Sequence, residues 1–167
     1  MPVTRLAGNI VLKIKFCWIG ETKDKRLLSL EQDFLARIKK FLPCEITHVP
    51  ELKKKDPRSR SAQMAKEGKK LLSMIHPFST VIVLDETGEE KSSQNLAKWM
   101  EKSMAGSISE LAFVVGGYWG LPDEIKKKAS KILSLSRMTF PHEIARVLLL
   151  EQVYRAITIN KNLPYHK

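Results

Sequence analysis

The sequence is poor in cysteine, and this scarcity excludes whole classes of protein. Cys17 and Cys44 are the two cysteines among 167 residues, and neither belongs to a Cys-x-x-Cys pair or to a His/Cys cluster with zinc-ligand spacing. The sequence therefore predicts neither a disulfide-rich secreted domain nor a metal site. Because both cysteines stand in apolar, strand-like surroundings, we expect buried, reduced thiols in a reducing compartment, the cytoplasm.

Long apolar runs are missing as well. No stretch approaches the roughly 18 uninterrupted apolar residues of a membrane-spanning helix. Residues 1–20 are mildly apolar, but Lys13 and Lys15 interrupt them and no clean cleavage site is present, so we do not expect a signal peptide. The sequence also lacks a basic amphipathic helix with a strong Trp/Phe/Leu face. We therefore expect no membrane partner.

Acidic residues are outnumbered by basic ones. The chain has 18 Asp and Glu against 29 Lys and Arg, a net charge of +11. Such an excess indicates a polyanionic partner, most simply nucleic acid bound through its phosphates. Charge that serves solubility alone is the other explanation. The segment "ELKKKDPRSRSAQ" fits a phosphate-binding surface and a solvated loop equally well, through its residues Lys53, Lys54, Lys55, Arg58 and Arg60.

What the chain does have is a regular alternation of strand and helix patterns. Apolar runs predict strands in "VLKIKFCWIG", "CEITHVP", "TVIVLDETGEE", "ELAFVVGG" and the start of "KILSLSRMTF". Helical spacing predicts helices over residues 25–41, 62–74, 121–129 and 142–159, and one more after a cap at Ser92 or Ser93. Length and apolar content suit one core. We therefore expect a single α/β domain with a mostly parallel sheet and helices on both faces.

The segment "FVVGGYWGLP" joins an apolar strand to three glycines. It is not a phosphate loop, because Leu121 and Pro122 follow the last glycine where a Lys-Ser/Thr pair is needed. The spacing of Gly116, Gly117 and Gly120 also differs from a dinucleotide fingerprint. Two interpretations remain: a tight turn that needs positive φ, or a wall that a flat, largely uncharged ligand approaches closely. The position at a strand end favours the ligand.

Polar residues mark two features near the C-terminus. The loop "SLSRMTFPHE" carries three hydroxyls, and its Thr139 is a candidate N-cap for the helix that begins at His142. Arg146, Glu151 and Arg155 interrupt the apolar pattern of that helix. Because Glu151 and Arg155 are four residues apart, they share a face. They form either a structural ion pair or a functional one, in which Glu151 orients Arg155 toward a phosphate or a base edge.

The segments "LDETG", "FVVGGYWGL", "SLSRMTFPHEIARVLLLEQVYRA" and "LPYHK", in this order and spacing, resemble the bacterial ribosomal large-subunit methyltransferase H family. The resemblance covers residues 12–167 as one SPOUT methyltransferase domain and leaves residues 1–11 as an N-terminal extension without an assigned role. It implies S-adenosylmethionine-dependent methylation of N3 of a pseudouridine in large-subunit (23S) rRNA, on assembled ribosomes. It also implies a homodimer and a deep trefoil knot in the C-terminal part of the chain.

The resemblance also assigns site residues. Those that would hold S-adenosylmethionine follow three strands: Leu84, Gly116, Leu135, Ser136, Arg137, Met138, Thr139 and Phe140. Those that would act in catalysis are Glu151, Arg155, Tyr165 and His166. In this scheme His166 is the candidate base for the N3 proton, and Tyr165 is a ring that can stack on the target base. Without the resemblance, a histidine so close to the terminus is expected to be disordered.

Two departures from the family's pattern are visible. Tyr118 and Trp119 are bulky where the family often has small or polar residues, and we expect them to pack without a direct role. Glu143 stands where a glutamine is common, which questions any amide-specific contact there.

Two other functions compete with this one: a basic RNA-binding or ribosome-assembly module without activity, and a SPOUT methyltransferase for tRNA. The retained glycines and C-terminal "PYHK" argue against the first. The lack of an appended RNA-binding domain argues mildly against the second.

Overall fold

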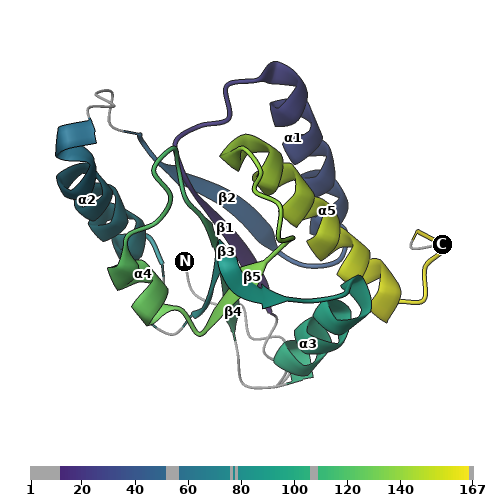
Figure 1. Ribbon diagram of the computed structural model, residues 1–167. Coiled ribbons are helices and arrows are strands. Elements are labelled where there is room, and N and C mark those ends of the chain that lie inside the picture. The colour runs from purple at the N-terminus through teal and green to yellow at the C-terminus, as the bar shows by residue number, and fades with distance from the viewer. Residues whose placement is uncertain (1–11, 52–56, 76, 78, 106–108, 166–167) are drawn as a thin grey trace.

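The computed structural model describes residues 12–51, 57–75, 77, 79–105 and 109–165, and the expected N-terminal extension, residues 1–11, lies outside them. Within this part, five parallel strands form one sheet in the order β2-β1-β4-β3-β5 (Figure 1). The strands are β1 Lys13–Ile19, β2 Cys44–Val49, β3 Thr80–Glu90, β4 Glu110–Val115 and β5 Lys131–Ser134. The helices are α1 Lys25–Lys39, α2 Arg60–Ser73, α3 Ser93–Ala105, α4 Asp123–Lys128 and α5 His142–Asn160, with a short 3-10 helix η1 at Pro57–Ser59.

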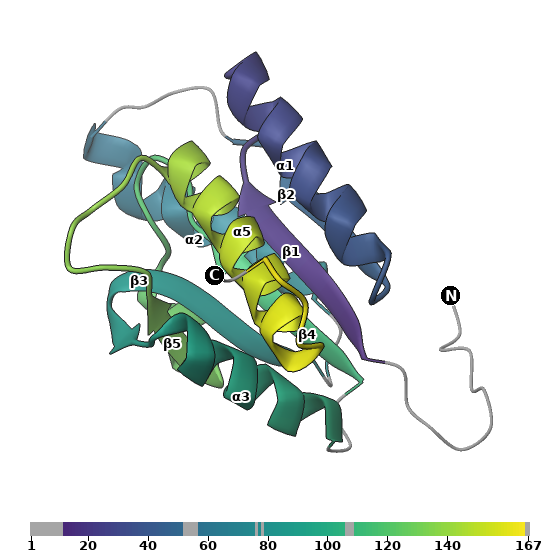
Figure 2. The same ribbon diagram turned by 90° about the vertical axis from the view of Figure 1, so that its right-hand side faces the viewer.

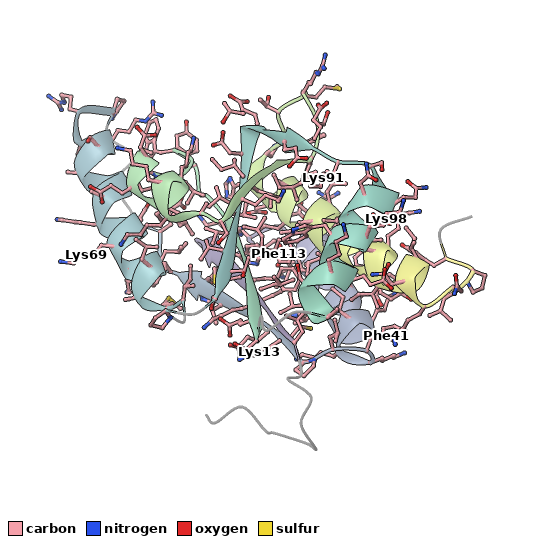
Figure 3. All side chains as sticks on the ribbon, turned by 90° about the horizontal axis from the view of Figure 1, so that it is seen from below. Lys13, Phe41, Lys69, Lys91, Lys98 and Phe113 are labelled. Carbon is pink, nitrogen blue, oxygen red and sulfur yellow. The ribbon has the colours of Figure 1, made fainter. Side chains whose placement is uncertain are left out.

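Helices cover both faces of the sheet, as the unbroken apolar runs of the strands require. Figure 2 shows α1, α3 and α5 side by side across one face, and Figure 1 shows α2 and α4 on the other. In the central strand β4, Leu111 and Phe113 pack with the first group of helices, whereas Ala112 and Val114 pack with the second. Figure 3 shows Phe113 in the interior of the molecule. The expected α/β fold is confirmed.

The helix starts agree with the sequence in one case and differ in another. Ser92 accepts a hydrogen bond from the backbone N–H of Asn95 at 3.1 Å, as expected of the residue that caps α3. The expected Thr139 cap of α5 is wrong, because the N-cap is Pro141, which makes no side-chain capping bond. Thr139 stands two residues too early in the chain to reach the first free N–H groups of that helix.

Strand β3 changes register halfway along its length. Leu84 and Glu89 both pair with Leu133 of β5, so the residues between them bulge out of the ladder. Gly88 lies in this bulge, and a Cβ atom there would lie 2.7 Å from the backbone carbonyl carbon of Leu133. The bulge therefore depends on a glycine, and it carries the side chains at 85–87 away from regular pairing.

A buried polar network ties α5 to the end of β1. Arg146 is fully buried and donates hydrogen bonds to the Thr22 hydroxyl at 2.9 Å and the Ile19 carbonyl at 2.7 Å. The Thr22 hydroxyl donates to the buried carboxylate of Glu31 at 2.6 Å. Burial lowers the pKa of Arg146 and raises the pKa of Glu31. If these elements moved apart, the buried charged groups would lose bonds that no water could replace. The network therefore holds β1, α1 and α5 in one arrangement.

Both cysteines are buried free thiols, as expected. Burial raises the pKa of Cys17 and raises that of Cys44 to about 11, so both thiols keep their protons and act as small apolar groups in the core. In the described part of the chain, no helix is long and apolar enough to cross a membrane.

Candidate ligand-binding site

A cavity of about 990 Å³ opens at the bulge of β3 and beyond the carboxyl ends of β4 and β5. Its walls come from the bulge of β3, the glycine turn after β4, the loop after β5 and the N-terminal end of α2. Parallel α/β sheets place their ligands at this edge, and the volume suits a molecule of nucleoside size. The three loops singled out in the sequence therefore meet around one space.

The residues expected to hold the cofactor gather here with one exception. The lining includes Leu84, Gly116, Leu135, Ser136, Met138, Thr139 and Phe140. Arg137 is not part of it: its side chain is 91% exposed and its Nε lies 3.5 Å from a carboxylate oxygen of Glu90. The loop after β5 is held by its own hydroxyls, since Ser134 donates to the Ser136 carbonyl and Ser136 accepts from the Met138 N–H.

The glycine turn closes on itself. Gly120 has φ +80° and donates its N–H to the Gly117 carbonyl at 3.0 Å. A Cβ on Gly116 would lie 2.7 Å from the carbonyl carbon of Gly120, and one on Gly117 would lie 2.9 Å from the side chain of Ile19. Of the two interpretations that the sequence allowed, the tight turn with positive φ is therefore present, at Gly120. The close approach at Gly116 is first of all to the chain's own backbone.

A carboxylate and an ammonium group lie together in the cavity wall. Lys126 Nζ is 2.5 Å from Asp85 Oδ2, and Thr87 donates to Asp85 Oδ1 from its hydroxyl at 2.6 Å. Burial by itself would raise the pKa of Asp85, but the hydrogen bonds from Lys126 and Thr87 outweigh it and leave the pKa below its ordinary value. This ion pair was not foreseen, because its members are far apart in the sequence and come together through the β3 bulge and α4.

Aromatic and basic side chains stand on the α2 side of the cavity. The Arg60 guanidinium lies 5.3 Å above the ring of Trp119, and the rings of Trp119 and Tyr118 meet edge to face with centroids 4.7 Å apart. Arg58 and Arg60 both line the cavity. The expected lysines at 53–55 lie outside the described residues.

The expected catalytic residues form a separate cluster on the C-terminal half of α5. Arg155 donates to Glu151 through Nε at 2.9 Å and Nη2 at 2.6 Å, which confirms the ion pair. Tyr165 donates its hydroxyl to Glu151 at 3.3 Å, and its ring packs edge to face on Tyr154 at 4.7 Å. His166 lies outside the described residues. The described lining of the cavity includes none of the other three expected residues.

The electrostatics of this cluster restrict what Tyr165 can do. Burial raises its pKa, and the neighbouring Glu151 carboxylate raises it further. The hydrogen bonds to Glu151 raise the pKa of Arg155, so the guanidinium stays charged. Tyr165 is therefore a neutral phenol that can stack or donate a hydrogen bond, but it does not supply a base near neutral pH.

Other chemistry is limited by what the residues offer. Across the described residues, no group of three or more His, Cys, Asp or Glu side chains is arranged to hold a metal ion. Glu143, which departs from the family's pattern, accepts the backbone N–H groups of Lys23 and Asp24 at 3.0 and 3.2 Å. Its role in this structure is to anchor the segment before α1.

Comparison with known proteins agrees with the geometry. The family model described as "Predicted SPOUT methyltransferase" matches residues 12–166. A protein of Christiangramia forsetii named "Ribosomal RNA large subunit methyltransferase H" is 37% identical, over 93% of this chain and 99% of its own length. A protein of the same name from Trichlorobacter lovleyi is 36% identical over the same shares.

Solved structures share the fold at much lower identity. A probable methyltransferase from Bordetella pertussis Tohama I superimposes with a TM-score of 0.58 and 12% identity, over 86% of this chain and 93% of that one. A probable methylase family protein from Haemophilus influenzae Rd KW20 gives 0.54 and 17%, over 92% and 70%. At these identities the likeness shows the fold alone.

Proposed function

The chain belongs to the SPOUT methyltransferase family, and on this premise we propose that it transfers a methyl group from S-adenosylmethionine to large-subunit ribosomal RNA. The membership confirms the family inferred from the sequence motifs. The observation that carries the proposal is that the β3 bulge, the glycine turn after β4 and the loop after β5 line one cavity. We further propose the target inferred from the resemblance, N3 of a pseudouridine in 23S rRNA on the assembled ribosome, in the cytoplasm.

The cavity fits the proposed cofactor on three counts. Leu84 and Leu135 offer apolar contacts to an adenine ring, and Gly116 and Gly117 bring backbone without side chains to the same wall. Asp85 and Lys126 offer a carboxylate to an ammonium group and an ammonium to a carboxylate, and a methionine moiety carries both. S-adenosylmethionine supplies a methyl group on a positively charged sulfur.

The protein's own residues then have to position the RNA substrate and shield the methyl transfer from water. The loop after β5 and the glycine turn after β4 both contribute walls of the cavity and can exclude water from the transfer. The nucleophile, a ring nitrogen, must lose its proton, and His166 remains our candidate base. Arg155, fixed by two hydrogen bonds to Glu151, is preorganised to hold a phosphate or a base edge.

We propose that the catalytic cluster serves the cavity of a second subunit. Glu151, Arg155 and Tyr165 are preorganised, yet they stand outside the described cavity lining of their own chain. A homodimer in which each tail approaches the partner's cavity brings the two halves of the site together. The C-terminal trefoil knot implied by the family likeness belongs to the same proposal.

Methyl transfer is tested with the purified protein, radiolabelled S-adenosylmethionine and three acceptors: large ribosomal subunits, small subunits and bulk tRNA. We expect label in large subunits. Mass mapping is then expected to assign the methyl group to one nucleotide of 23S rRNA. Cofactor and RNA binding without any transfer would indicate the inactive assembly module instead. Label in tRNA alone would indicate the other competing function.

Replacing Gly116 with alanine is expected to weaken cofactor binding by at least about tenfold, because the new Cβ would lie 2.7 Å from the Gly120 backbone and would force the turn open. Gly120→Ala is the matched control: no atom lies within 4 Å of its new Cβ, and the φ of +80° costs about 1–2 kcal/mol of stability. Isothermal titration with S-adenosylmethionine measures the affinity and thermal melting the stability. Equal affinities for both variants would contradict the role given to Gly116.

A further inference from the structure

The glycine turn carries two consecutive aromatic residues, Trp119 in the cavity wall and Tyr118 in contact with it. Trp119 lines the cavity, whereas Tyr118 does not and is 57% exposed. The turn is shaped for this projection, because Gly116 and Gly117 leave no space for a side chain and Gly120 adopts positive φ. The three glycines thus flank two large side chains, of which Trp119 lines the cavity and Tyr118 is exposed to solvent.

The Tyr118 ring is supported by its contact with Trp119. Tyr118 meets Trp119 edge to face at 4.7 Å and 84°, and Trp119 in turn lies under the Arg60 guanidinium at 5.3 Å. Such contacts between aromatic rings and between a cation and a ring are favourable when geometry is well defined. Tyr118 is therefore an exposed ring with a fixed support, which lowers the entropy lost when another flat group packs on it.

The surroundings select the kind of flat group. Arg58 and Arg60 are exposed and line the same cavity, in a chain with a net charge of +11. On the loop after β5, Met138 is 72% exposed and also lines the cavity. An aromatic platform flanked by guanidinium groups matches an unpaired nucleic-acid base with its phosphates, since bases stack on aromatic rings and arginines neutralise the backbone.

We propose that Tyr118 is a stacking platform for an unpaired base of the RNA substrate that neighbours the target nucleotide, with Arg58 and Arg60 at the adjoining phosphates. This inference rests on the proposed function, because Tyr118 packs on Trp119, which lines the cavity assigned to the methyl donor. It goes beyond the expectation that Tyr118 packs without a direct role: the ring does pack on Trp119, but at 57% exposure it contributes little to the core. In this proposal Tyr118 holds the RNA substrate by stacking, and the cavity holds the cofactor.

The platform is tested with three variants that separate ring, bulk and hydroxyl. Tyr118→Ala removes the ring, Tyr118→Leu keeps apolar bulk without a π face, and Tyr118→Phe removes the hydroxyl alone. The probe is a single-stranded oligoribonucleotide with one 2-aminopurine, whose fluorescence is quenched on stacking. We expect Ala and Leu to weaken RNA affinity about tenfold and to abolish the quenching. Phe is expected to keep both within about twofold, since stacking is a property of the ring.

Two measurements make the outcome decisive. The affinity for S-adenosylmethionine alone is expected to stay within about twofold in all three variants, because Tyr118 is outside the described cavity lining. A parallel loss of cofactor affinity would make Tyr118 a cover for the cofactor and overturn the platform. Unquenched fluorescence with the wild type, or equal RNA affinity for Ala and Phe, would overturn it as well. Failure of the methyltransferase function itself shows separately, as absence of transfer by the wild type to ribosomal subunits.

Discussion

Deleting Tyr165 to Lys167 is expected to leave the protein folded and to lower methyl transfer by about 10²–10⁴-fold, the range that a general base contributes. The folding cost is small because Tyr165, the described residue of the deleted tail, packs its ring on Tyr154 and Arg155. Its hydroxyl adds one long hydrogen bond to Glu151. Loss of one such aromatic contact costs about 0.5–1.5 kcal/mol. The rate is measured with saturating cofactor, and folding by thermal melting.

Two shorter deletions identify which residue of the tail matters. Removing Lys167 alone is expected to keep the activity, whereas removing His166 and Lys167 is expected to lose it while the Tyr165 contacts to Glu151 and Tyr154 persist. Full activity of the chain that lacks residues 165–167 would refute the role given to the tail.

Mixing two impaired chains, the truncated one and Gly116→Ala, tests whether the tail acts on a partner. The cofactor concentration is kept well below the dissociation constant of the Gly116→Ala variant. The truncated chain keeps an intact cavity, and the Gly116→Ala chain keeps an intact tail. If the catalytic cluster serves the other subunit, mixed dimers contain one complete site and recover activity after unfolding and refolding together. A mixture that stays inactive, although mixed dimers have formed, would mean that each tail serves its own chain.

Replacing Arg146 with leucine is expected to lower the free energy of unfolding by about 3–5 kcal/mol, the cost of removing one partner from a buried charged network. The substitution leaves the Ile19 carbonyl and the Thr22 hydroxyl without their donor, and it leaves the buried Glu31 carboxylate without its nearest cation. Urea unfolding gives the value. A loss below about 1 kcal/mol would show that Arg146 does not hold the network together.

The matched control and the pH dependence sharpen this test. Glu31→Gln keeps an acceptor for Thr22 and removes the charge, so combining it with Arg146→Leu is expected to restore part of the loss. Burial raises the pKa of Glu31 in the folded wild type, and loss of the Arg146 charge raises it further. A raised folded pKa gives stability that is present below the ordinary value of about 4.3 and is lost as pH rises. The Arg146→Leu deficit is therefore expected to grow from pH 4 toward neutral pH, as Glu31 is forced to ionise in the folded chain.

Sequence alone predicted what depends on neighbours along the chain. Strand and helix periods, the Ser92 cap and the Glu151–Arg155 pair are local patterns, and each is present. The prediction that the glycine turn and the loop after β5 enclose one ligand came from the family resemblance. Tertiary partners were beyond reach: Asp85 meets Lys126 and Arg146 meets Thr22 across long stretches of sequence. No spacing rule links such positions, because the order of strands in the sheet decides which ends meet.

The place of β4 in the sheet has a consequence for how the chain acquires its shape during synthesis. β4 pairs with β1 on one side and β3 on the other, and its first residue, Glu110, pairs with Lys13 of β1. A nascent chain that has not yet reached Glu110 leaves the inner edges of β1 and β3 unpaired, and such edges favour aggregation. Insertion of one late strand closes both edges at once, so the topology couples the two halves of the molecule and is typical of slow folding.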